Sequence, residues 1–146
     1  METLKYQTEI NASAEKVWDV LWNDNTYSQW THYFSPGSVM ESDWQVGGKT
    51  LFLDASRKNG MISTIQKIEK PTVVIFKHSG EIINGIEDTE SEKVKVWSGG
   101  LEAYFLEENN GKTVLKIEVD YDDSFKEMME EGFRKGLEII KELSEK

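Results

Sequence analysis

Cysteine is absent from the 146 residues, and this absence removes several kinds of site at once. Without a thiol the chain can hold no disulfide framework, no cysteine nucleophile and no thiolate zinc site. A chain without disulfides fits a reducing compartment. We therefore expect a cytoplasmic protein.

Long apolar runs are missing as well. No stretch approaches the roughly 18 consecutive apolar residues that a membrane span requires. The beginning of the chain, METLKYQTEI, lacks the basic and apolar regions of a secretory signal. Neither membrane insertion nor secretion is expected.

Basic residues are few relative to acidic ones. The 17 Lys and Arg residues oppose 27 Asp and Glu residues, so the formal net charge is −10. Nucleic acid and anionic membrane surfaces are therefore poor candidate partners. An apolar fraction of 38% and an aromatic fraction of 11% are typical of a folded domain, and the length predicts one domain over residues 1–146.

No nucleotide, catalytic or metal motif is complete. The two Gly-Lys-Thr tripeptides, at 48–50 and 111–113, lack the upstream glycine of a phosphate-binding loop. The acidic run 120–124 is similar to a calcium loop, but a phenylalanine stands where that loop needs glycine. The two histidines, His32 and His78, do not have metal-ligand spacing. We predict neither a cofactor nor a metal ion.

Alternating apolar and polar side chains predict strands over most of the chain. The expected strands are 3–10, 38–45, 49–54, 60–68, 72–79, 94–106 and 112–121. After the first strand, Ser13 is a candidate N-cap for a short helix, and a second short helix is expected over 25–31. The stretch 80–92 is acidic and has no basic residue, so it is expected to be a solvated, mobile loop with little packing.

The end of the chain has helical periodicity. A capping-box pattern at 124–127 is followed by apolar residues three to four positions apart, which predicts a helix over 124–143. Gly132 and Gly136 lie within this helix, where each costs about 1 kcal/mol relative to alanine. Their presence indicates either a close approach of another segment or free space beside the helix.

The predicted order of elements resembles the helix-grip order of the START-like superfamily, to which the SRPBCC and Bet v 1-like proteins belong. A more specific resemblance is to the SRPBCC proteins named for homology to the activator of heat-shock-protein-90 ATPase. The segments that carry it are ASAEKVWDVLWND with Trp30, SDWQVGG, GMISTIQKIEKP, residues 78–106 and the closing EEGFRKGLEIIKEL. Together they span essentially the whole chain.

This resemblance implies an α+β helix-grip fold. In such a fold, a curved antiparallel sheet of six or seven strands wraps around a long C-terminal helix, and two short helices follow strand one. The resemblance also implies a cavity between sheet and helix, which accepts small hydrophobic molecules in related proteins. Methionines and glycines on the closing helix agree with a cavity, although an ordinary packed core uses the same residue types.

Strand alternation indicates which side chains face such a cavity. On the strand 72–79, the charge of Lys77 favours an inward face made of Val74, Phe76 and His78. On the strand 94–106, hydrophobicity alone would bury Trp97, Leu101, Ala103 and Phe105.

The resemblance favours the opposite face of the strand 94–106, with Glu102 and Tyr104 inward, and we adopt that register. His78 and Glu102 then lie on neighbouring strands of one face, where they can pair. Such a pair would offset part of the cost of burying a carboxylate.

We therefore expect a cytosolic protein that binds a small, mostly hydrophobic molecule in the cavity. The expected walls are Trp44, Phe76, Trp97, Tyr104, Met128 and Phe133, and the expected polar anchors are His78, Glu102 and Tyr104. The negative charge of the chain favours a neutral or cationic ligand over an anionic one.

Two alternatives stay open. The family name suggests an interaction protein that acts as a chaperone cofactor. Related cavities also host cyclases and dehydratases, in which case His78 and Glu102 would be general acid and base. The sequence leaves the oligomeric state open between monomer and dimer.

Overall fold

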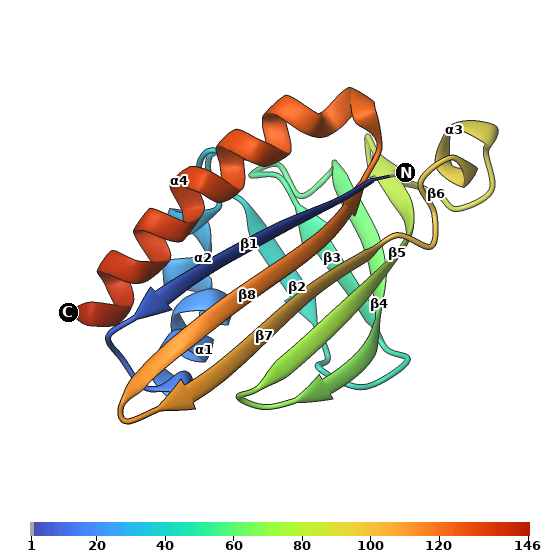
Figure 1. Ribbon diagram of the computed structural model, residues 1–146. Coiled ribbons are helices and arrows are strands. Elements are labelled where there is room, and N and C mark those ends of the chain that lie inside the picture. Colours follow the sequence, from blue (N-terminus) through green and yellow to red (C-terminus); the bar gives the residue numbers. More distant parts are fainter. Residues whose placement is uncertain (1) are drawn as a thin grey trace.

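The computed structural model describes residues 2–146 and shows a curved antiparallel sheet that wraps around a long C-terminal helix (Figure 1). The strands are β1 (Glu2–Ile10), β2 (Val39–Ser42), β3 (Lys49–Leu53), β4 (Gly60–Glu69), β5 (Val73–Ile83), β6 (Ile86–Asp88), β7 (Leu101–Asn109) and β8 (Lys112–Tyr121). The helices are α1 (Ala14–Trp22), α2 (Asp24–Trp30), α3 (Glu92–Lys95), α4 (Lys126–Glu145) and the short 3-10 helix η1 (Asp123–Phe125). The α+β helix-grip prediction is confirmed.

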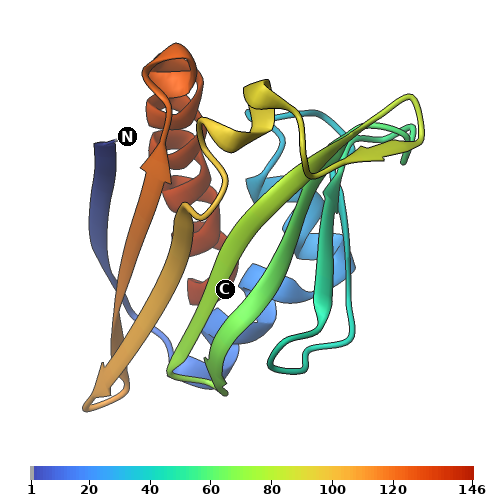
Figure 2. The same cartoon turned by 90° about the vertical axis from the view of Figure 1, so that its right-hand side faces the viewer.

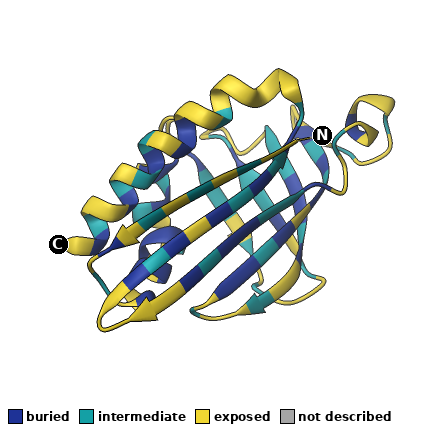
Figure 3. Cartoon of the chain, in the orientation of Figure 1, coloured by how far each residue is buried: buried dark blue, intermediate teal, exposed yellow. Residues whose placement is uncertain are grey.

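The strands form one sheet in the order β1-β8-β7-β5-β4-β3-β2, and β6 pairs with β5 outside this path. All strand pairs are antiparallel. The sheet curls so that α1, α2 and α4 lie on its concave side (Figure 2). Buried residues alternate along the central strands, because only one face of each strand meets the helices (Figure 3).

The two short helices form where the sequence predicts them. Ser13 caps α1 by accepting a hydrogen bond from the backbone N–H of Lys16, and Asn23 ends α1 and caps α2. The Trp30 indole N–H donates to the Leu21 carbonyl oxygen at 3.0 Å and ties the two helices together. The pair therefore forms one compact block under the sheet.

The C-terminal helix forms as predicted, but it starts differently from the expected capping box. Asp122, rather than Ser124, provides the cap, because its carboxylate accepts from the Ser124 N–H and starts η1. Helix α4 then continues from Lys126 without a side-chain cap of its own. Phe133 and Ile140 are buried on its inner face.

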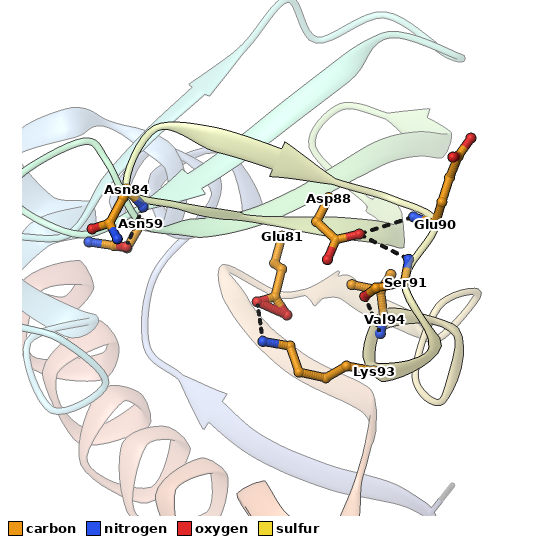
Figure 4. Close-up of polar contacts among 8 residues, drawn as sticks. All are labelled: Asn59, Glu81, Asn84, Asp88, Glu90, Ser91, Lys93 and Val94. Atoms are coloured by element: carbon orange, nitrogen blue, oxygen red, sulfur yellow. Dashed lines mark hydrogen bonds and ion pairs between the residues drawn. The ribbon is translucent and has the colours of Figure 1, made fainter.

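The prediction that 80–92 is a loop with little packing is wrong. Strand β5 continues to Ile83 and turns through Asn84 into β6, and the Glu81 carboxylate meets Lys93 Nζ at 3.2 Å (Figure 4). Ile82 is buried in a small cluster with Leu53. Apolar and polar side chains alternate through this stretch, so it has a buried side. The prediction missed that side because it relied on the many acidic residues.

The expected strand 94–106 also starts later than predicted. Ser91 caps the short helix α3, and Gly99 has a positive φ of 91° that turns the chain into β7 at Leu101. Similarly, the expected strand 38–45 ends at Ser42 as β2. The other predicted strands agree with the structure to within a few residues, apart from the extension of β5.

Candidate functional site

A cavity of about 430 Å³ lies between the sheet and the first half of α4. Aromatic side chains form much of its wall: Tyr27, Trp30, Phe34, Phe52, Trp97, Tyr104, Tyr121, Phe125 and Phe133. Met61, Met128 and Met129 add flexible apolar surface. A cavity of this size and lining is typical of a site for a small organic molecule.

The rim of this cavity includes residues at the start of α4. Phe125 and Met128 line the cavity and are also 46% and 45% exposed to solvent. Both belong to the segment where η1 passes into α4, above the end of β8 in Figure 1. Large apolar side chains that stay this exposed beside a cavity provide a hydrophobic entrance.

A row of polar side chains crosses three neighbouring strands of the concave face. The Ser63 hydroxyl lies 2.6 Å from Nδ1 of His78, and Nε2 of His78 lies 3.3 Å from Oε1 of Glu102. The hydroxyl of Tyr104 donates to the other carboxylate oxygen of Glu102. The row therefore runs from β4 through β5 to β7, and its Glu102 end reaches the cavity.

The hydrogen-bond inventory assigns the protons of this row. Ser63 is fully buried, and within residues 2–146 its hydroxyl has no partner other than His78. If Nδ1 carried a proton, the Ser63 proton would have no acceptor, which is costly in a buried site. Ser63 therefore donates to Nδ1, and the ring donates its Nε2–H to Glu102.

Tyr104 holds its proton for a related reason. Burial, with the negative charge of Glu102 as a second cause, raises the pKa of Tyr104 well above its ordinary value. The phenol thus stays a donor to the Glu102 carboxylate over the whole physiological range. Burial also raises the pKa of Tyr27, which lies in the same wall.

These assignments limit the chemistry available to the row. Both ring nitrogens of His78 are occupied, one by Ser63 and one by Glu102. The carboxylate of Glu102 retains acceptor positions and lines the cavity, so it is the member of the row that can receive a hydrogen bond or a proton from a bound molecule. His78 acts on such a molecule only through Glu102.

Six of the eight predicted site residues line this cavity: His78, Trp97, Glu102, Tyr104, Met128 and Phe133. The predicted contact of His78 with Glu102 and the inward register of Tyr104 are confirmed. Trp97 reaches the wall from the segment that follows α3, rather than from a strand.

The other two predicted residues lie elsewhere. Trp44 follows the end of β2 with a positive φ of 57° and packs against Trp22, whose ring is 5.6 Å away. Phe76 points inward but is fully buried, and the Phe52 ring, 5.1 Å from it, lines the cavity instead. Both residues thus belong to the packed aromatic cluster next to the cavity.

Sequence reasoning missed the contribution of the segment around α2. Tyr27, Trp30 and Phe34 line the cavity together with Phe52 on β3. The density of aromatic residues between 27 and 34 was the available signal, since such side chains require a partner surface. Alternation could not find Tyr27, Trp30 and Phe34, because these three residues lie outside the sheet.

The described residues show no metal site or membrane segment. Within residues 2–146, no group of three or more His, Cys, Asp or Glu side chains could hold a metal ion. No helix in this part of the chain combines the length and the apolar character that crossing a membrane requires.

Several solved structures of other proteins have the same fold as this chain. The Aha1 dimer from Colwellia psychrerythraea aligns with a TM-score of 0.73 and 17% identity, over 99% of this chain and 97% of that chain. A protein from Arthrobacter aurescens gives a TM-score of 0.71 and 19% identity, over 97% and 85% of the two chains. A protein from Chromobacterium violaceum gives 0.69 and 16%, over 100% and 99%. At these identities the likeness shows the fold.

Family membership comes from the sequence match. A search of curated proteins found no match to the chain. The family model described as "Activator of Hsp90 ATPase homolog 1-like protein" matches residues 11–145, which include all the helices and every strand except β1. The chain therefore belongs to the family of activator of Hsp90 ATPase homolog 1-like proteins.

Proposed function

We propose that the protein binds a small, mostly hydrophobic molecule in the cavity between the sheet and α4, in the cytosol. The observation that carries the proposal is the wall itself, in which nine aromatic and three methionine side chains surround about 430 Å³. Apolar walls provide affinity for such a molecule, and the few polar groups fix its orientation. Among the polar groups, Glu102 is best suited to anchor a ligand, because its carboxylate is mostly buried and has acceptor positions that no protein donor fills.

Binding of a neutral apolar dye tests this proposal. The dye N-phenyl-1-naphthylamine increases its fluorescence in apolar surroundings, so we expect saturable binding of one dye per chain. The variant Met128→Trp narrows the entrance, and we expect it to weaken dye binding about tenfold, because lost contacts and overpacking oppose entry.

A matched control uses the neighbouring residue on the same helix. Glu127 is exposed and does not line the cavity, so Glu127→Trp adds the same side chain outside the entrance. Equal dye affinities in Met128→Trp and Glu127→Trp, or no saturable binding to the wild type, would contradict the proposal. Native mass spectrometry of freshly purified protein would then identify any molecule carried from the cell.

A second candidate function is cooperation with a chaperone ATPase, and the family match supports it. Fold kinship alone does not carry this activity to the chain. The test is the ATPase rate of the chaperone Hsp90 with and without the protein, combined with a pull-down. An unchanged rate and no retained protein would remove this candidate, whereas the dye experiment would be unaffected.

The oligomeric state is part of the same question. The aligned Colwellia psychrerythraea structure is that of a dimer, whereas the sequence leaves monomer and dimer open. Sedimentation equilibrium distinguishes the two states directly. Dye titrations at several protein concentrations would then show whether assembly changes access to the cavity.

A further inference from the structure

The charged side chains that line the cavity are all acidic. Five carboxylate residues line it, namely Asp54, Glu81, Glu102, Asp120 and Asp122. Within the described residues 2–146, no Lys or Arg side chain is part of the lining. One of the five carboxylates, that of Glu81, forms an ion pair with Lys93 on α3, as Figure 4 shows.

Most of these carboxylates already serve the protein's own hydrogen bonds. Asp120 accepts from Thr3 and from the Leu101 N–H, and Asp122 caps η1. Asp54 accepts from Ser56 and Asn59. These groups set a negative potential around the cavity, but they are not free anchors.

Glu102 differs from them in burial and in partners. Its side chain is only 15% exposed, and its carboxylate meets the His78 ring and the Tyr104 phenol, with no Lys or Arg in contact among the described residues. Two hydrogen-bond donors satisfy two of about four acceptor positions of a carboxylate. The carboxylate is thus mostly buried without a Lys or Arg partner, and a cation that reached it from the cavity would offset part of the cost of its burial.

The geometry points to an organic cation as the ligand: a protonated amine that meets Glu102, with an apolar body that fills the aromatic part of the cavity. This inference rests on the proposed function and adds the class of head group. A charge-assisted hydrogen bond to Glu102 would complete the acceptor positions that the protein leaves open. The surrounding aromatic faces favour a cation for a second reason, because their π-electrons attract positive charge.

Three ligands that share one alkyl chain test the head group. Decylammonium, decanol and decanoate are titrated against protein loaded with N-phenyl-1-naphthylamine, below their micelle-forming concentrations. We expect decylammonium to displace the dye at a concentration about tenfold lower than decanol, and decanoate to be the weakest competitor. Equal or better displacement by decanol in the wild type would overturn the inference while the dye result upholds the proposed function.

The variant Glu102→Gln keeps the shape of the anchor and removes its charge. We expect the affinity for decylammonium to fall to within about twofold of that for decanol, which the variant should bind as the wild type does. Glu107 is exposed on the same strand β7 and does not line the cavity, so Glu107→Gln removes one charge from the molecule without touching the anchor. This control should keep the full preference.

Salt dependence separates the anchor from general attraction to a chain of net charge −10. Screening weakens attraction between exposed charges, whereas a buried contact is screened far less. A preference that survives in Glu102→Gln, or that disappears at high salt in the wild type, would assign it to the surface and overturn the inference. If the dye itself does not bind, the proposed function fails as well.

Discussion

Four polar side chains on the concave face are linked by hydrogen bonds into one row: Ser63, His78, Glu102 and Tyr104. Each donor of the row meets one acceptor. The need of Ser63 for an acceptor sets the direction of the two His78 bonds, and the retained phenol proton of Tyr104 sets the third. Such a row is worth more than isolated pairs, because each member fixes the orientation of the next. These contacts fix the orientation of the Glu102 carboxylate at the wall of the cavity.

Removal of the Ser63 hydroxyl tests the assigned protons. In Ser63→Ala the Nδ1 atom of His78 loses its only donor, so we expect a loss of unfolding free energy of about 1–3 kcal/mol. The ring-nitrogen chemical shifts of His78, measured by NMR, should show an Nε2–H imidazole in the wild type. Observation of a proton on Nδ1 in the wild type would reverse the assignment.

Ser79 provides the matched control for this variant. Its hydroxyl lies on the same strand as His78 but only partly buried, and it makes a long bond of 3.3 Å to the Ile62 carbonyl oxygen. Ser79→Ala should change stability by less than about 0.5 kcal/mol and leave the ring-nitrogen shifts unchanged. Equal effects of the two substitutions would mean that any lost hydroxyl here has the same consequence.

At the residue scale the sequence predicted three of the four members of this row, His78, Glu102 and Tyr104. They followed from alternation combined with a family resemblance, because burial alternates along β5 from Phe76 to His78 and β7 pairs regularly with β5 from Leu101 to Phe105. Ser63 could not be predicted, since the ladder between β4 and β5 shifts register between Ile62 and Ser63. A bulge of this kind changes which residues are opposite each other, and alternation carries no signal for it.

Two glycines of α4 determine how closely the helix approaches the end of α2 and the segment that follows it. A Cβ atom placed on Gly136 would lie 2.9 Å from the carbonyl oxygen of Trp30, and one on Gly132 would lie 2.4 Å from the Phe34 ring. Both glycines therefore mark a close approach, one of the two explanations that the sequence left open. The obstacles differ, because one is backbone and the other is a ring at the cavity wall.

This difference predicts different outcomes for the two alanine substitutions. Gly136→Ala meets a backbone atom that cannot move alone, so we expect a net loss of about 1–3 kcal/mol despite the better helix propensity of alanine. Gly132→Ala displaces the Phe34 ring into free cavity space, so we expect a loss below about 1 kcal/mol but weaker dye binding. Chemical unfolding and dye titration measure both quantities, and equal stabilities of the two variants would contradict the prediction.

Phe133 connects the helix to the sheet at the edge of the cavity. Its ring is 2% exposed and packs against Tyr6 and Phe34, with ring centroids 5.3 and 4.9 Å away. Phe133→Ala should cost about 3 kcal/mol, the lower end of the range for a buried phenylalanine, because one side of the ring already borders empty space. Denaturant unfolding checks this value, and a loss below about 1 kcal/mol would mean that α4 does not depend on this contact.

The helices and strands with a clear hydrophobic periodicity were predictable from the sequence, whereas the short elements that connect them were not. Helix α4 and the strands β1 and β8 have strong periodicity, and the predicted bounds match the structure closely. The hairpin of β5 with β6 was hidden because its exposed side is acidic, although Ile82 keeps a buried side. Helix α3 has a single turn, which is too short for a hydrophobic period to reveal.

The whole molecule combines a well-packed half with a hollow half. Around Trp22, aromatic rings pack at centroid distances from 4.8 to 6.4 Å, and this cluster includes Trp44 and Phe76. The cavity begins beyond Tyr104 and Phe52 and extends to the start of α4. Sequence could indicate the inward residues, but it could not divide them between the two halves, because packed and hollow regions use the same residue types.

Three buried tyrosines make the stability of the whole molecule sensitive to alkaline pH. Burial raises the pKa values of Tyr27 and Tyr104, and a hydrogen bond to Glu2 raises the pKa of Tyr121 to about 12. The unfolded chain releases these protons near pH 10, the ordinary value, whereas the folded protein retains them. Above that pH the folded state binds more protons, so the free energy of unfolding must fall as the pH rises.

We therefore expect urea unfolding between about pH 8 and pH 11 to show constant stability up to about pH 10 and a steep decline above it. Tyr104 should contribute on the order of 1 kcal/mol per pH unit to this decline. Tyr104→Phe should lower stability at neutral pH, because Glu102 loses a donor, and should flatten the alkaline decline. Tyr33, which is 48% exposed, supplies the control, because Tyr33→Phe removes a phenol that water solvates in both states. An alkaline decline equally steep in wild type and Tyr104→Phe would show that Tyr104 ionises as readily in the folded protein as in the unfolded chain, and the donor role assigned to it would be wrong.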